Sequence, residues 1–129
     1  MSLGTKKWRY RYRLKKLIDE AVEKDIVVVS AASNDGKKSY PAYFRNVIGV
    51  KSNNIHLEKT FYYKRAFYYA PGTVPKNVYP EGRGNSFAAA YITGYIAKAI
   101  YDRKLKGNKQ VSDYLKTNMN FLNKEGMND

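Results

Sequence analysis

The sequence is organised around Gly84-Asn85-Ser86-Phe87-Ala88-Ala89-Ala90-Tyr91-Ile92-Thr93-Gly94. Small and apolar residues follow Ser86 and continue to Ile100, which predicts a buried helix that begins at this serine. The Ser86 hydroxyl and N–H would then lie at the positive end of a helix dipole, where unpaired N–H groups can hold a developing negative charge. Acyl transfer requires such an environment beside its nucleophile. Serine is also a favoured N-cap, so helix capping alone is the simpler interpretation of this pattern.

A second stretch, Asp25-Ile26-Val27-Val28-Val29-Ser30-Ala31-Ala32, is a short run of mainly β-branched residues. Its unbroken apolarity indicates a strand that is covered on both faces, as in a parallel sheet flanked by helices. The run ends in Ser33-Asn34-Asp35-Gly36, and open α/β sheets bind ligands at such carboxyl ends of strands. Asn34 is therefore either a turn former or a side-chain amide that points into a site as an oxyanion donor.

Residues 5–24 predict an amphipathic helix, because their apolar residues recur at helical spacing. Those residues are Tyr10, Leu14, Leu17, Ile18, Ala21 and Val22. The first half of the helix also interleaves Trp8, Tyr10 and Tyr12 with Arg9, Arg11 and Arg13, a mixture that can stack on bases and neutralise phosphates. We favour the alternative interpretation, a solvated face whose long basic side chains cover apolar surface.

Composition restricts the function classes. A chain of 129 residues with 43% hydrophobic content can form one domain at most. The absence of cysteine excludes disulfides and thiolate metal sites, and a lone histidine, His56, cannot build a histidine-based zinc site. We expect no cofactor and assign no residue to a metal, and calcium sites stay open. The sequence as written has no export signal, and its longest apolar run, residues 87–97, is too short to span a bilayer. As written the chain would be cytoplasmic, and the location of the protein otherwise stays open.

The formal net charge is +13, from 24 Lys and Arg against 11 Asp and Glu. Such a charge attracts nucleic acid, anionic lipid or acidic protein through long-range fields. The charges are nevertheless spread along the whole chain among 13 tyrosines, and a general bias in composition explains them equally well. We therefore expect nucleic-acid binding to be weak and non-specific.

The stretch at Gly84 resembles the active-serine motif of the subtilases, the subtilisin-like serine peptidases, which reads Gly-Thr-Ser-Met-Ala-x-Pro-His-x-x-Gly. Four residues match this motif in register, namely Gly84, Ser86, Ala88 and Gly94. Four others depart from it, namely Asn85, Phe87, Ala90 and Tyr91. Because the motif is incomplete, further family segments are needed to support the resemblance.

Those segments occur in family order. Residues 27–36 are similar to the family's Val-Val-Ala-Ala-Ala-Gly-Asn-x-Gly, with Asn34 at the position of the side-chain oxyanion donor. Tyr40-Pro41-Ala42 and the following Val47-Ile48-Gly49-Val50 resemble a family turn and strand, and Ala70-Pro71-Gly72 resembles the end of the next strand. Ser2-Leu3-Gly4 stands where the family has a Ser-Leu-Gly that lines the substrate groove. A weaker likeness links residues 111–116 to a short helix near the family's C-terminal end.

The resemblance implies an α/β fold, a three-layer sandwich that corresponds to the C-terminal half of a subtilisin-like, doubly wound parallel sheet. Residues 1–129 would then form a partial subtilase domain. The expected strands lie near Ile26–Ala31, Val47–Lys51 and Ala66–Ala70, and the expected long helices at 6–24 and 86–103. An edge left uncovered by missing strands would favour self-association.

The resemblance also implies peptide-bond hydrolysis through an acyl-enzyme. Ser86 would be the nucleophile, the Ser86 N–H and the Asn34 amide would hold the oxyanion, and Ser2, Leu3 and Gly4 would bind the extended backbone of a peptide or protein substrate. The family's Asp and His belong to segments that would precede Ser2, and His56 has no catalytic counterpart. The chain alone is therefore expected to be inactive unless the N-terminal half of the domain is supplied. The alternative is a basic nucleic-acid-binding or scaffold protein without catalysis.

Overall fold

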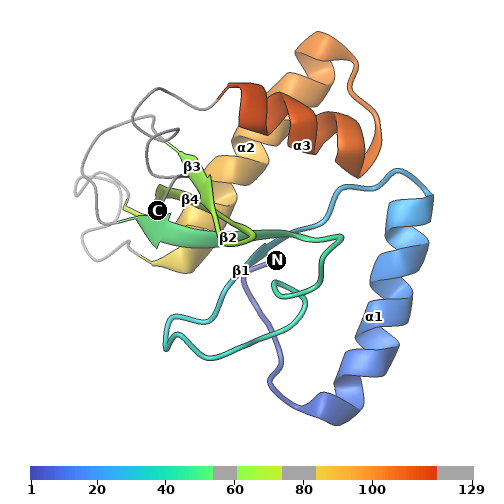
Figure 1. The fold of residues 1–129 in the computed structure, drawn as a ribbon, viewed down its shortest axis with the longest axis vertical. Coiled ribbons are helices and arrows are strands. Elements are labelled where there is room, and N and C mark those ends of the chain that lie inside the picture. The colour runs from blue at the N-terminus through green and yellow to red at the C-terminus, as the bar shows by residue number, and fades with distance from the viewer. Residues whose placement is uncertain (54–60, 74–83, 119–129) are drawn as a thin grey trace.

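The computed structural model describes residues 1–53, 61–73 and 84–118, and His56 lies outside these ranges. In chain order the elements are α1 (Trp8–Glu23), β1 (Val29–Ala31), β2 (Ile48–Asn53), β3 (Tyr62–Lys64), β4 (Phe67–Pro71), α2 (Asn85–Arg103) and α3 (Gly107–Thr117). Figure 1 shows α2 passing behind the strands, α3 beside the far end of α2, and α1 apart from both. The elements predicted from the sequence are therefore present, with ends that differ by a few residues.

The four strands form one sheet in the order β1-β2-β4-β3. β1 and β4 both run parallel to β2, with Val29 opposite Ile48 and Val50 opposite Tyr68. These pairings confirm the predicted α/β fold with a mostly parallel sheet. The antiparallel strand β3, which pairs with β4, was not predicted. It is joined to β4 by Arg65 and Ala66, both at positive φ, and neither residue is of the type that usually marks such a turn.

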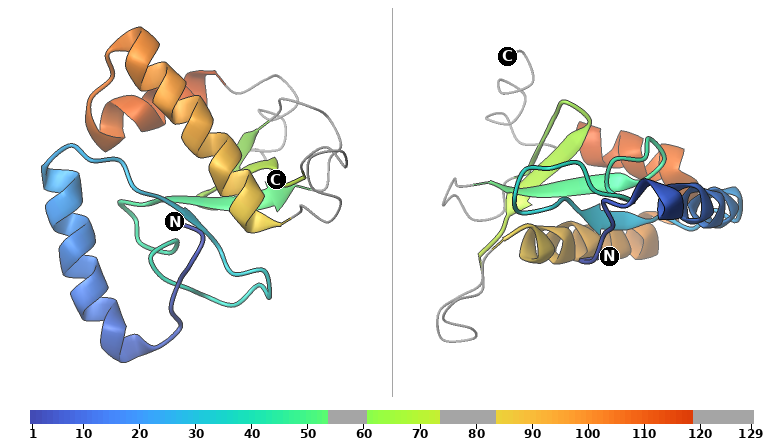
Figure 2. Two further views of the ribbon diagram at one scale, coloured as in Figure 1. Left: turned by 180° about the vertical axis from the view of Figure 1, so that it is seen from behind. Right: turned by 90° about the horizontal axis from the view of Figure 1, so that it is seen from below.

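One face of the sheet packs against α2, and the right-hand view of Figure 2 shows the strands between α2 and α3. Ala88, a small residue, lets α2 approach the sheet closely, and both Ala88 and Ile92 are fully buried in one cluster with Val50 and Ala70. Val111 and Leu115 of α3 complete the same apolar cluster. The predicted buried helix and buried strand thus meet in the main core of the molecule.

The opposite face of the sheet is covered by the segment that leads into β2. Gly49 leaves room there, since a Cβ atom at this position would lie 2.5 Å from the Ala42 carbonyl oxygen and 2.7 Å from the Phe67 ring. Ala32, Ala42 and Phe67 form a buried cluster on this face. This segment, rather than a helix, therefore supplies the third layer over the centre of the sheet.

Helix α1 packs on that segment through Ile18, which is buried against Phe44 and Val47. Most of its other apolar side chains are exposed, including Trp8 and Leu17 at 85% and 62%. The amphipathic helix predicted from the sequence is present, but its apolar face is covered only in part. Within the described ranges, no helix is long and apolar enough to cross a lipid bilayer.

Candidate active site

Two of the predicted site residues, Asn34 and Ser86, are brought together at the carboxyl end of the sheet. Asn34 follows β1, and Ser86 is the second residue of α2. The side-chain oxygen of Asn34 accepts a hydrogen bond from the Asn85 backbone N–H at 3.1 Å. Asn34 therefore lies against the residue that immediately precedes Ser86.

Gly84 makes this approach possible. Its φ of 125° and ψ of −177° belong to a region that is essentially restricted to glycine. A Cβ atom on Gly84 would lie 3.4 Å from the Asn34 side-chain oxygen, and the Gly84 N–H donates to the Gly72 carbonyl at 2.7 Å. The chain thus turns sharply into α2 at Gly84, in contact with the Asn34 side chain.

Asn85 holds three segments together at this point. Its side-chain oxygen accepts from the Ser52 N–H at 2.7 Å, and its amide nitrogen donates to the carbonyls of Ala32 and Ser33 at 3.0 and 3.3 Å. The side chain is buried, and its partners lie in β2 and just after β1. In the sequence, Asn85 stands out only as a departure from the family motif. Its structural role could have been predicted from its place between a glycine and a buried apolar run, because an amide that is buried there needs hydrogen-bond partners.

The hydrogen bond to Asn85 fixes which end of the Asn34 amide is the oxygen and which is the NH₂ group. Because the oxygen accepts from Asn85, the NH₂ group is the end that remains to donate. Asn34 itself is exposed, and Ser86 is half-buried. The Ser86 N–H lies in the first turn of α2, where the helix provides no acceptor. A hydroxyl and two potential oxyanion donors are thus gathered at one helix start.

The turn after Asn34 is held by Asp35. Its carboxylate pairs with Lys6 and accepts hydrogen bonds from the Ser33 hydroxyl at 2.6 Å and the Lys37 N–H at 3.0 Å. The ion pair with Lys6, followed by these hydrogen bonds, holds the pKa of Asp35 well below its usual value. The ion pair and the two hydrogen bonds engage the Asp35 carboxylate, so Asp35 positions the turn.

Ser2, Leu3 and Gly4 run along the same end of the sheet. The Ala31 N–H donates to the Met1 carbonyl at 2.8 Å, and the Met1 amino group donates to the Val29 carbonyl. Residues 2–4 are exposed, and they are followed by two backbone hydrogen bonds that join Thr5 to Tyr40. This segment therefore lies beside the end of β1, close in space to the Asn34 turn.

The described part of the chain contains no histidine that could act as a base for Ser86, since the one histidine of the sequence is His56. Nor does that part place three or more His, Cys, Asp or Glu side chains where they could hold a metal ion. The described residues thus present a candidate nucleophile and candidate oxyanion donors.

Comparison with known proteins adds to this geometry. A family model described as "Subtilase family" matches residues 1–129. Subtilisin E of Bacillus subtilis (strain 168) is 28% identical over 123 aligned residues, which cover 84% of this chain and 32% of that protein. The major intracellular serine protease of the same strain is 32% identical over 99 residues, which cover 65% of this chain and 31% of that protein. The chain thus spans about a third of the length of these curated relatives.

Proposed function

Since the chain belongs to the subtilase family of serine peptidases, we propose that it carries the nucleophile and the oxyanion hole of a subtilisin-like serine endopeptidase. The observation that carries this proposal is the hydrogen bond from the Asn85 N–H to the Asn34 side-chain oxygen, at 3.1 Å. This bond engages the amide oxygen and leaves the Asn34 NH₂ available to donate beside the start of α2. The proposal therefore rests on how these residues are arranged as well as on the family motif.

In the proposed reaction the Ser86 hydroxyl attacks the carbonyl carbon of the scissile peptide bond. The C–N bond then breaks, the amine leaves as the first product, and the acyl group stays on Ser86 as an acyl-enzyme. The negative charge that develops on the carbonyl oxygen is held by the Ser86 N–H and the Asn34 side-chain NH₂. The exposed backbone of Ser2, Leu3 and Gly4 pairs with the extended substrate. Water then hydrolyses the acyl-enzyme, releasing the second product and restoring Ser86.

This mechanism needs a general base that takes the Ser86 proton and later protonates the leaving amine. The family uses a histidine oriented by an aspartate, both located before the Ser-Leu-Gly segment. We propose that these groups come from a segment outside the 129 residues, in the same polypeptide or in a partner chain. The 129 residues alone should therefore hydrolyse peptides at a rate close to background.

The test compares two proteins on a chromogenic peptide substrate. The first is the purified 129-residue chain, for which we expect no turnover above background. The second joins the Asp- and His-bearing segment of a characterised subtilase to Ser2, and here we expect cleavage that Ser86→Ala abolishes. An active-serine reagent such as a fluorophosphonate should label Ser86 of the joined protein, as read by peptide mass spectrometry. Robust turnover by the 129-residue chain that survives Ser86→Ala would contradict the proposed roles.

A further inference from the structure

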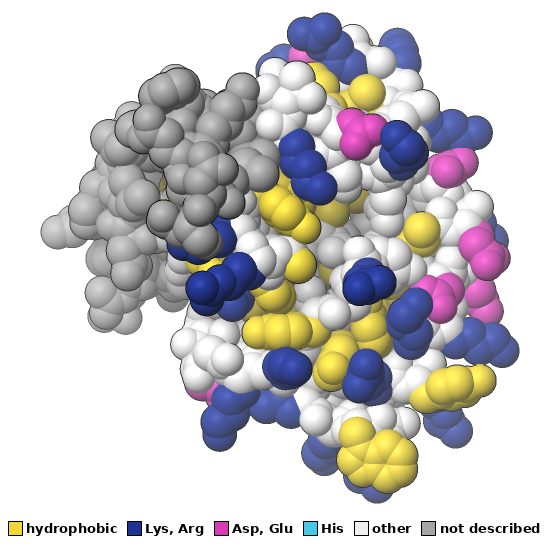
Figure 3. Space-filling model, in the orientation of Figure 1, with side chains coloured by type: hydrophobic (Ala, Val, Ile, Leu, Met, Phe, Trp, Pro, Cys, Tyr) yellow, Lys and Arg dark blue, Asp and Glu magenta, His cyan; other side chains and the backbone are white. Residues whose placement is uncertain are grey.

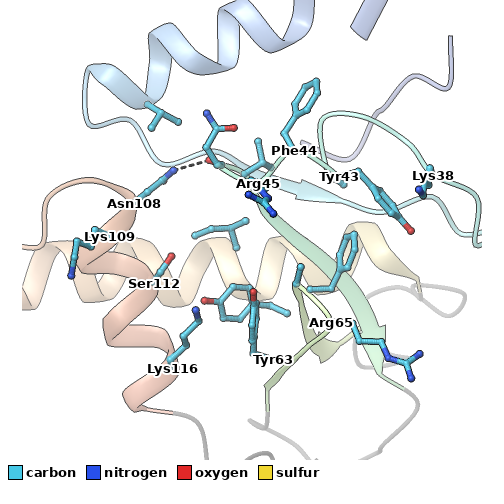
Figure 4. A pocket seen from close by; sticks show the side chains of 18 residues that line it. Lys38, Tyr43, Phe44, Arg45, Tyr63, Arg65, Asn108, Lys109, Ser112 and Lys116 are labelled. Carbon is cyan, nitrogen blue, oxygen red and sulfur yellow. Dashed lines mark hydrogen bonds between the residues drawn. The ribbon is translucent and has the colours of Figure 1, made fainter. Parts of the chain in front are cut away.

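A groove of about 800 Å³ lies at the other end of the sheet from Ser86. Ile48 and Phe67, the first residues of β2 and β4, line it, whereas Ser52 and Asn85 mark the opposite end of the sheet. Figure 4 shows its walls, with α3 on one side and the turns that carry Lys38 and Arg65 on the other. The groove is therefore separate from the candidate active site.

The groove is strongly basic. Its lining includes five cationic residues, Lys38, Arg45, Arg65, Lys109 and Lys116, and no Asp or Glu among the described residues. Lys109 pairs with Asp113 of the same helix, but exposed pairs of this kind are weak and are readily exchanged. Figure 3 shows Lys and Arg side chains around and over an apolar area on this face. Clefts lined by charge of one sign concentrate ligands of the opposite sign.

The floor of the groove is aromatic, and its rings are already in contact with cations. The Lys116 ammonium lies 4.5 Å from the ring centre of Tyr63, and the Lys51 ammonium lies 4.4 Å from that of Phe67. Nucleic-acid bases bind single-strand sites by stacking on free ring faces, which these cations occupy in part. Carboxylates, by contrast, can meet the ammonium groups directly while apolar side chains contact the remaining ring edges.

The walls of the groove are held in place before any ligand binds. The Asn108 side chain of α3 donates to the Asn46 carbonyl at 2.7 Å, the hydrogen bond drawn in Figure 4. The Asn46 side chain in turn donates to Asp19 of α1 at 2.7 Å. A preformed site loses less conformational entropy on binding than one that must be assembled.

We propose that this groove binds an acidic, partly apolar segment of a polypeptide, independently of the peptidase activity. Carboxylates of the segment pair with the cations on the rim, and its apolar side chains contact the half-buried ring of Tyr63, beside the buried Phe67. The occupant is defined by complementarity to a groove with five cations and an aromatic floor. A nucleic acid is the competing occupant, and the experiment separates the two.

The experiment measures binding of a fluorescein-labelled peptide of alternating glutamate and leucine by fluorescence anisotropy, at low and at physiological salt. The groove variant is Arg45→Gln, Lys109→Gln, Lys116→Gln. The control variant, Lys7→Gln, Arg13→Gln, Lys16→Gln, removes the same charge from α1 and from the residue immediately before it. We expect the groove variant to bind about tenfold more weakly or worse, as when partly desolvated charge pairs are lost. The control should change affinity by about twofold at most, because exposed charges contribute little.

Equal losses in the two variants would overturn the proposal, since net charge alone would then explain binding. It would also be overturned if a single-stranded oligonucleotide of equal charge bound more tightly than the peptide and lost affinity in the groove variant. Carbodiimide cross-linking in the unchanged protein provides a measurement that does not depend on the variant folding. Cross-links from peptide carboxylates should concentrate on Lys38, Lys109 and Lys116, and an even distribution over all lysines would count against the groove.

Discussion

At the scale of single residues, the start of α2 depends on a glycine. Gly84→Ala should lower the free energy of unfolding by about 1–3 kcal/mol, the usual cost of holding a side chain in such a backbone region. Gly94→Ala is the matched control, because Gly94 lies inside α2 with nothing within 4 Å of a Cβ atom. This control should stabilise the helix by about 0.5–1 kcal/mol. Urea unfolding followed by circular dichroism measures both, and an unchanged midpoint for Gly84→Ala would contradict the assigned conformation.

The hydrogen bonds of the buried Asn85 side chain should contribute to the stability of the fold. Asn85→Ala leaves the Ser52 N–H and the Ala32 carbonyl without their partner, and each such loss typically costs about 1–3 kcal/mol. Asn118→Ala, which removes one exposed hydrogen bond to the Tyr114 carbonyl, should cost far less. Thermal unfolding of the two variants provides the comparison. Similar melting temperatures for both would show that Asn85 does not hold the strand ends to α2.

The buried Tyr68 should make the folded state less stable at alkaline pH. Burial is the main cause that raises its pKa to about 12, from the ordinary value of 10.0. Because the folded-state pKa is higher, the stabilisation is fully present below about pH 10 and is lost as the pH rises to about 12. Tyr68→Phe should therefore flatten the fall of stability in this window, whereas Tyr12→Phe, at an exposed position, should not. Denaturant unfolding across this pH range measures the difference, and identical pH profiles would contradict it.

At the scale of elements, the question is whether the aromatic and basic side chains of α1 bind nucleic acid. Its cations already contact rings of the chain itself, with the Arg11 guanidinium 4.5 Å from the ring centre of Tyr40 and that of Arg9 5.0 Å from Tyr10. This arrangement agrees with a solvated face, although Trp8 and Tyr12 remain exposed. We therefore expect weak binding of DNA and RNA that is indifferent to sequence.

That expectation is tested by replacing Trp8, Arg9, Arg11 and Arg13 together and measuring oligonucleotide binding across a salt series. Affinity in the unchanged protein should fall steeply with salt, with a slope of about −0.9 for each neutralised phosphate of duplex DNA. The replacement should reduce that slope, while Ser86→Ala and Asn34→Ala leave it unchanged. A sequence-selective complex that persists at physiological salt would instead support nucleic-acid recognition by α1.

At the scale of the whole molecule, the exposed apolar side chains of α1 predict self-association. Trp8, Tyr12 and Leu17 are exposed at 85%, 80% and 62%. They lie on α1, which packs against the rest of the molecule on one side only. Sedimentation velocity at physiological salt should show association that rises with protein concentration. Leu17→Glu should weaken it, and Tyr101→Glu, at an exposed position in α2, should not. A monodisperse monomer across the concentration range would contradict this prediction.

The sequence by itself determined the elements whose signals are local. The β-branched run before Asn34 and the apolar run after Ser86 predicted β1 and α2, because hydrophobic periodicity depends on neighbours in the chain. The order of the matching segments predicted the family and the positions of Asn34 and Ser86. Their catalytic roles remain proposals.

Only the tertiary structure decided the features that depend on contacts between distant segments. Asn34 is hydrogen-bonded to the start of α2, and Asn85 is hydrogen-bonded to the ends of two strands. The basic groove is likewise lined by residues that are far apart in the chain. β3 could not be predicted because its turn uses Arg65 and Ala66 at positive φ. Such backbone conformations persist only when the surrounding packing compensates their cost, and that packing is set by the whole fold.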